Sequence, residues 1–147
     1  RASGFTITRR YETAAGVSLE GKKIPLGALV RVRLRVSSKD KQNYVAIDDK
    51  LPAGLEPLNA NLATTEQVAT GKLTPEVTAG LQFLSHSELR DARVAFYADE
   101  LPAGTYEYIY LARATTPGKF LRPAAGAEAM YAPEIIGATA IDDVIIE

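Results

Sequence analysis

The stretch Leu29-Val30-Arg31-Val32-Arg33-Leu34-Arg35-Val36 carries the clearest fold signal, because aliphatic and arginine side chains alternate in it. Successive side chains of a β-strand point to opposite faces, so the aliphatic residues share one face and the arginines share the other. Apolar spacing at i, i+3 and i+4, which an amphipathic helix needs, does not persist along the chain for more than a turn or two. The stretch therefore predicts a strand with one buried side and one solvent-facing side.

The same alternation recurs and predicts an all-β fold, an antiparallel β-sandwich. Further strands are expected at residues 5–8, 43–47, 93–97, 106–114, 137–141 and 144–146. Residues 106–114 have apolar side chains on both faces, as expected of a central strand.

The connections carry their own signals. Leu101-Pro102-Ala103-Gly104 joins two expected strands at a spacing typical of a hairpin. Leu51-Pro52-Ala53-Gly54 has the same sequence and follows another expected strand. We interpret it as the same strand-ending turn used twice. Residues 56–80 lack any period and exceed a typical connection, so we expect an excursion with a short helix near residues 65–70 or 75–79.

Composition limits the classes of function. The 147 residues suffice for one core, so residues 1–147 are expected to form a single domain. With 17 basic and 18 acidic side chains the net charge is −1, which gives no field toward nucleic acid or anionic lipid. Direct membrane insertion is not expected either, because no apolar run approaches the roughly 18 residues of a spanning helix. The chain opens without methionine, and we expect it to be a piece excised from a larger protein.

Reactive groups are scarce. The chain has no cysteine, which excludes disulfides, thiolate metal ligands and a cysteine nucleophile. His86 is the single histidine and has Ser85, Ser87 and Glu88 beside it, which suggests a triad. Neighbours along a strand point to opposite faces, so this run cannot by itself assemble one, and a surface histidine is the favoured interpretation. No phosphate-binding loop, dinucleotide motif or zinc site is found, and we predict no enzyme, no catalytic residue and no cofactor.

Charged clusters leave alternatives open. Three pairs of adjacent acidic residues occur: Asp48 with Asp49, Asp99 with Glu100, and Asp142 with Asp143. They can supply Ca²⁺ ligands or can be solvated carboxylates at strand ends. No twelve-residue loop of alternating acids is found, so we favour the second interpretation. The arginines of residues 29–36, with Lys39 and Lys41, can dock an acidic partner or can protect an exposed sheet edge against pairing, which we favour.

The segment Glu128-Ala129-Met130-Tyr131-Ala132-Pro133-Glu134 is unusual for a loop. A thioether and an aromatic ring lie together just ahead of a proline. They can fill or cap the core, or they can grip a neighbouring domain.

Several blocks together resemble the C-terminal domain of bacterial α2-macroglobulins. They are Tyr44-Val45-Ala46-Ile47-Asp48-Asp49-Lys50-Leu51-Pro52-Ala53-Gly54-Leu55-Glu56-Pro57-Leu58-Asn59, Leu101-Pro102-Ala103-Gly104-Thr105-Tyr106, Tyr110-Leu111-Ala112-Arg113-Ala114-Thr115-Thr116-Pro117-Gly118 and Met130-Tyr131-Ala132-Pro133-Glu134. The opening Gly4-Phe5-Thr6-Ile7-Thr8-Arg9-Arg10-Tyr11 is similar as well, so the resemblance extends over nearly the whole chain.

The resemblance implies a macroglobulin-type β-sandwich, the counterpart of the receptor-binding domain of the animal proteins, in a large peptidase inhibitor. That parent is expected to be periplasmic or extracellular, lipid-anchored, and to trap host or competitor peptidases. Its thioester, where present, belongs to a separate domain, and Met130 and Tyr131 match the loop that covers it. We therefore expect a non-catalytic domain whose partners are the thioester-type and macroglobulin domains of the same parent chain. An immunoglobulin-like structural or adhesion module is the alternative function, and a carbohydrate-binding or hydrolytic accessory domain is a weaker one.

Overall fold

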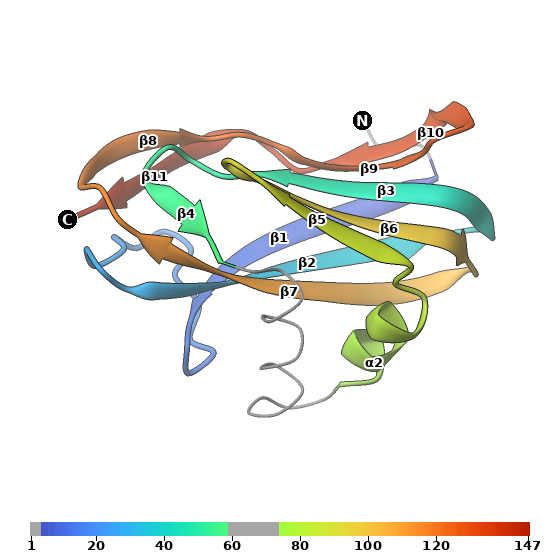
Figure 1. Ribbon diagram of the computed structural model, residues 1–147, viewed down its shortest axis with the longest axis horizontal. Coiled ribbons are helices and arrows are strands. Elements are labelled where there is room, and N and C mark those ends of the chain that lie inside the picture. The colour runs from blue at the N-terminus through green and yellow to red at the C-terminus, as the bar shows by residue number, and fades with distance from the viewer. Residues whose placement is uncertain (1–3, 59–73) are drawn as a thin grey trace.

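The computed structural model describes residues 4–58 and 74–147, and its strands are stacked in two layers (Figure 1). In chain order the elements are β1 (Phe5–Thr13), β2 (Leu29–Ser38), β3 (Gln42–Lys50), β4 (Leu55–Pro57), α2 (Pro75–Gln82), β5 (His86–Arg90), β6 (Arg93–Leu101), β7 (Gly104–Ala114), β8 (Gly118–Arg122), β9 (Ala125–Ala129), β10 (Ala132–Ala138) and β11 (Asp142–Ile146).

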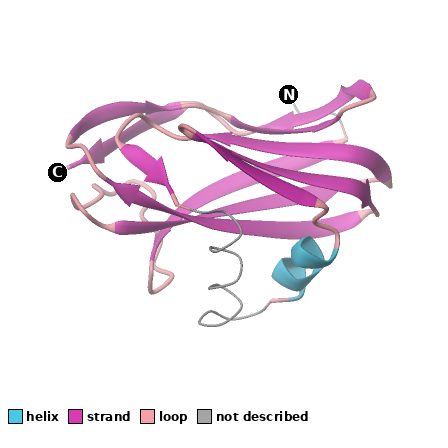
Figure 2. Ribbon diagram, viewed as in Figure 1, coloured by secondary structure: helices cyan, strands magenta, loops and turns pink. Residues whose placement is uncertain are grey.

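Two sheets face each other. The first sheet has the order β1-β2-β7-β4, and the second has the order β10-β9-β3-β6-β5. A separate ribbon pairs β8 with β11. Neighbouring strands are antiparallel in every ladder. Figure 2 shows strands in both layers with α2 beside one of them, which confirms the expected antiparallel β-sandwich.

The aliphatic side chains of residues 30–36 lie in the core. All four of them, on β2, are fully buried: Val30, Val32, Leu34 and Val36. Opposite them, Ile47 of β3 and Phe96 of β6 are also fully buried. The Phe96 ring stacks on Tyr108 of β7 with centroids 5.3 Å apart. Full burial of one such side chain contributes about 1.5–3 kcal/mol, so this face alone supplies much of the driving force for closing the sandwich.

An ion pair inside the core joins the two sheets. Arg9 Nη1 on β1 lies 2.6 Å from Asp49 Oδ1 on β3, and the two side chains are 2% and 0% exposed. The hydroxyl of Tyr110 on β7 donates to the other carboxylate oxygen of Asp49. Burial raises the pKa of the Asp49 carboxyl, while the charge of Arg9 and the hydrogen bond from Tyr110 oppose the rise. Asp49 therefore ties one strand of the second sheet to two strands of the first.

The arginine face does not protect an edge, because β2 lies between β1 and β7. Glu12 of β1 accepts hydrogen bonds from Arg31 and Arg33, each at 3.0 Å. Glu107 of β7 accepts from Arg33 at 2.7 Å and from Arg35 at 3.0 Å. Burial pushes the pKa of Glu12 upward, but the hydrogen bonds from Arg33 and Arg31 outweigh it, and the pKa lies below the ordinary value. The prediction that these arginines protect a sheet edge was wrong. Alternation shows which side chains of a strand are buried, but it does not show whether the strand lies at the edge or in the middle of its sheet.

The expected hairpin at Leu101-Pro102-Ala103-Gly104 is also wrong. This link leaves β6 in the second sheet and enters β7 in the first. The Tyr106 hydroxyl donates to the Pro102 carbonyl at 2.7 Å and fixes the corner, as in other sandwiches with a tyrosine corner. Residues 51–54, which have the same letters, carry the chain from β3 to β4 and so also cross between the sheets. Both copies of the Leu-Pro-Ala-Gly sequence thus connect a strand of the second sheet to a strand of the first.

Of the two expected helix positions, residues 75–79 are confirmed, and residues 65–70 lie outside the described residues. Helix α2 runs on to Gln82, and its N-cap Thr74 accepts a hydrogen bond from the N–H of Val77 at 3.2 Å. Gly80 packs against the first sheet so closely that a Cβ there would collide with the carbonyl oxygen of Glu107. No helix in the described ranges is long and apolar enough to cross a bilayer.

Candidate functional site

The segment of residues 128–134 forms a hairpin. Strand β9 ends at Ala129, β10 begins at Ala132, and Met130 and Tyr131 make the turn between them. Figure 1 shows this turn at one end of the sandwich. The segment is therefore mostly strand, and the two residues that we singled out from the sequence are its tip.

The base of this hairpin is held firmly. The inward side chains of β9 are small and buried, which lets the strand pack tightly between β3 and β10: Ala125, Ala127 and Ala129. On β10, Gly137 approaches β1 so closely that a Cβ there would lie 2.6 Å from the carbonyl oxygen of Phe5. Gly4, just ahead of β1, forms a parallel bridge with Ile136. Both strands of the hairpin are thus anchored to neighbouring strands at its base, although the register of β10 on β9 shifts between Ala132 and Ile136.

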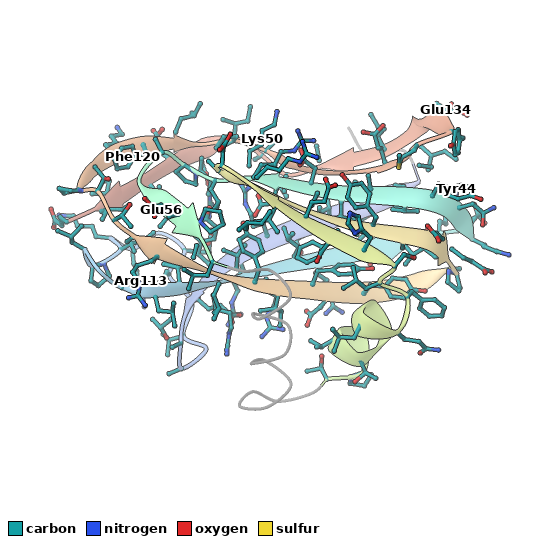
Figure 3. All side chains as sticks on the ribbon, viewed as in Figure 1. Tyr44, Lys50, Glu56, Arg113, Phe120 and Glu134 are labelled. Atoms are coloured by element: carbon teal, nitrogen blue, oxygen red, sulfur yellow. The ribbon has the colours of Figure 1, made fainter. Side chains whose placement is uncertain are left out.

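Three neighbouring residues with exposed apolar side chains are here called the apolar tip: Tyr44, Met130 and Tyr131. They are 50%, 48% and 81% exposed, and Tyr131 is the most exposed large apolar side chain that the structure describes. The Tyr131 ring meets the Tyr44 ring edge to face, with centroids 5.2 Å apart and planes at 89°. Figure 3 places Tyr44 at the same end of the molecule as Glu134. An exposed cluster of this kind on an ordered element is typical of a contact surface.

Tyr44 was missed in the sequence reasoning, which placed it in an ordinary strand. Its φ is +57°, a left-handed conformation that costs a residue with a side chain roughly 1–2 kcal/mol. Its carbonyl accepts a hydrogen bond from the N–H of Met130 at 2.9 Å, one residue beyond the end of β9. Glycine or asparagine would have signalled such a conformation, whereas a tyrosine gives no sign of it.

The apolar tip presents a thioether and two aromatic rings, which can exclude water. His86 lies on β5 at one edge of the second sheet, while β10 forms the other edge. Its Nε2 is 3.3 Å from Glu88, and its ring stacks on Tyr97. Ser85 Oγ instead accepts a hydrogen bond from the N–H of Asp99 at 2.9 Å. His86 is thus the exposed strand histidine that we favoured, and these neighbours do not form a triad.

The acidic pairs are divided among separate partners. Five of these six carboxylates make ion pairs with different cations: Asp48 with Arg93, Asp49 with Arg9, Glu100 with Lys41, Asp142 with Arg122, and Asp143 with Lys119. The interpretation as solvated carboxylates is wrong for Asp49, which is fully buried in the core. Among the described residues no group of three or more acidic or histidine side chains converges in a way that could hold a metal ion.

Several known proteins with similar sequences carry the name α2-macroglobulin or α2-macroglobulin homolog. The "Alpha-2-macroglobulin homolog" of Nostoc sp. is 34% identical over 124 residues, which is 84% of this chain and 6% of that protein. The "Alpha-2-macroglobulin" of Escherichia coli strain K12 is 36% identical over 146 residues, which is 95% of this chain and 9% of that protein. The chain therefore spans less than a tenth of the length of either relative.

Solved structures agree. The native conformation of E. coli α2-macroglobulin, seen by cryo-electron microscopy, matches all of this chain with a TM-score of 0.86 and 28% identity over 10% of its own length. A crystal structure of the same protein, spanning domain MG7 to the C-terminus, matches with a TM-score of 0.82 and 26% identity over 24% of its length. Residues 4–134 match the family described as the bacterial alpha-2-macroglobulin MG10 domain. By sequence and by fold, this chain belongs to the bacterial α2-macroglobulin MG10 domain family.

Proposed function

We propose that this chain is the non-catalytic C-terminal covering domain of a bacterial α2-macroglobulin peptidase trap. In the proposed arrangement, Met130 and Tyr131 lie against the thioester-type domain of the same parent chain and keep water from its electrophile. The parent traps peptidases and is periplasmic and lipid-anchored.

One observation carries this proposal: Met130 and Tyr131 project, 48% and 81% exposed, from a two-residue turn whose strands are both anchored. Exposing a thioether and an aromatic ring to water is unfavourable, so a partner surface is expected to cover them. The anchored strands would set these side chains against the partner at little further cost in conformational entropy. Excluding water from an electrophile protects it from hydrolysis.

The first experiment uses the full-length parent. Tyr131→Ala should accelerate the reaction of the thioester with methylamine, measured as the appearance of a free thiol. Leu121→Ala is a matched control, because Leu121 is also a large exposed side chain, 60% exposed, but lies on the β8–β11 ribbon. An unchanged rate in Tyr131→Ala, or an equal effect of Leu121→Ala, would reject the covering role.

A second experiment applies whether or not the parent carries a thioester. Met130 is the only methionine of this chain, so its oxidation by dilute peroxide can be followed by mass spectrometry of a single peptide. If the tip contacts a neighbouring domain, Met130 should oxidise several-fold more slowly in the parent than in the 147-residue chain. Equal rates would mean that the tip stays in solvent, and the proposal would then fail.

A further inference from the structure

The ring of Tyr44 is placed to restrain Tyr131. The edge-to-face contact, with centroids 5.2 Å apart, has the geometry that aromatic pairs favour. Since Tyr131 is 81% exposed, little of its surface touches protein, and this contact supplies a large part of its restraint.

The backbone of Tyr44 has a second role at the same place. Within β3 its neighbours are paired with β6, Asn43 opposite Glu100 and Val45 opposite Ala98, while Tyr44 itself is left-handed. Its carbonyl accepts the hydrogen bond from Met130 at 2.9 Å. Unfavourable conformations of this kind persist where the surrounding structure holds them, and they cluster at functional sites. One residue thus contacts both members of the turn, Met130 through its backbone and Tyr131 through its ring.

We infer that Tyr44 is the positioning residue of the apolar tip: its ring holds Tyr131 in the orientation that meets the partner domain. This inference rests on the proposed function. It adds a residue from a different strand to the covering surface, and Tyr44, itself 50% exposed, would share the contact with Met130 and Tyr131.

Two substitutions separate the ring from the backbone. Tyr44→Asn removes the ring and keeps a residue that tolerates the left-handed conformation, so the bond from Met130 should remain. Tyr44→Phe keeps the ring. Asparagine relieves the backbone strain at this position, so Tyr44→Asn should not lower the denaturation midpoint. If Tyr44 only served the stability of the fold, Tyr44→Asn would therefore leave the Tyr131 ring unchanged.

The decisive measurement is NMR of the 147-residue chain with labelled tyrosine rings. In Tyr44→Asn the relaxation of the Tyr131 ring signals should report faster motion, while exchange of the Met130 amide is unchanged. In Tyr44→Phe both should match the unsubstituted chain. In the parent, Tyr44→Asn should speed the methylamine reaction by roughly 2- to 12-fold, the factor that corresponds to one aromatic pair.

Unchanged motion of the Tyr131 ring in Tyr44→Asn, or an equal increase in Tyr44→Phe, would overturn the inference. Its failure differs from failure of the covering role. If Tyr44→Asn frees the Tyr131 ring while Tyr131→Ala leaves the methylamine reaction unchanged, the positioning by Tyr44 stands and the covering role falls.

Discussion

Replacing Asp49 by alanine tests the ion pair that joins the two sheets. The substitution removes the carboxylate that lies 2.6 Å from Arg9 and accepts the Tyr110 hydroxyl. Arg9 is left as a positive charge whose side chain is 2% exposed, and it cannot lose its proton to escape the cost. Removing one partner of a buried ion pair costs about 3–5 kcal/mol. The total stability of such a domain is about 5–15 kcal/mol, so the loss is a large fraction of it.

The assay is equilibrium denaturation followed by circular dichroism. For a domain of this size each kcal/mol lowers the midpoint temperature by about 2–4 °C, so Asp49→Ala should lower it by roughly 6–20 °C. Asp48→Ala is the matched control, because Asp48 is the adjacent residue and pairs with Arg93, whose side chain is 53% exposed. An exposed pair of that kind contributes about 0.2–1 kcal/mol.

A loss below about 1 kcal/mol, or one equal to that of Asp48→Ala, would show that Arg9 and Asp49 do not form a buried ion pair, since an unpaired buried charge costs more than that. A double variant with Arg9→Met and Asp49→Leu sharpens the test. It removes both charges together, and it should recover much of the stability lost in Asp49→Ala because no unpaired charge remains in the core.

Three further predictions concern other contacts. The pKa of Glu12 lies below the ordinary value of 4.5, so its ion pairs stabilise the fold above that pH and are lost as the pH falls through the lower pKa of the folded state. Glu12→Gln removes this titrating group, so the urea midpoint of the variant should depend less on pH below about pH 4.5. Gly80→Ala, which stabilises an ordinary helix, should here destabilise by about 1–3 kcal/mol, because its Cβ meets the Glu107 carbonyl, and an unchanged or raised melting temperature would contradict this. Tyr106→Phe should cost about 0.5–1.5 kcal/mol in urea denaturation by removing the hydroxyl that donates to Pro102, and equal stability would show that the corner does not need this bond.

Alternation along β2 was enough to predict its buried face, because side-chain direction in a strand depends on the strand alone. Its neighbours depend on residues far away in the chain, and Glu12 and Glu107 could not be recognised as partners of the arginines from spacing. The link at residues 101–104 illustrates the same limit. Four residues can close a hairpin or carry the chain from one sheet to the other. Which of the two forms depends on the strands with which β6 and β7 pair.

The candidate site was predictable in part. Met130 and Tyr131 were singled out because they are unusual beside a proline, and the resemblance to a family supported the choice. Tyr44 lies 86 positions before Met130 in the numbering and joins them through the pairing of β3 with β9. Neither that pairing nor a positive φ at a tyrosine leaves a trace in the sequence.

The anchoring of the β9–β10 hairpin limits how its tip can move. With β9 paired to β3, and β10 joined to the start of β1 through Gly4 and Gly137, the turn cannot swing outward as a flap without breaking backbone hydrogen bonds. Its two side chains can rotate, but the backbone beneath them moves with the sandwich. Under the proposed function, uncovering would therefore require displacement of the whole sandwich as a rigid body, and a local hinge in the turn would not suffice.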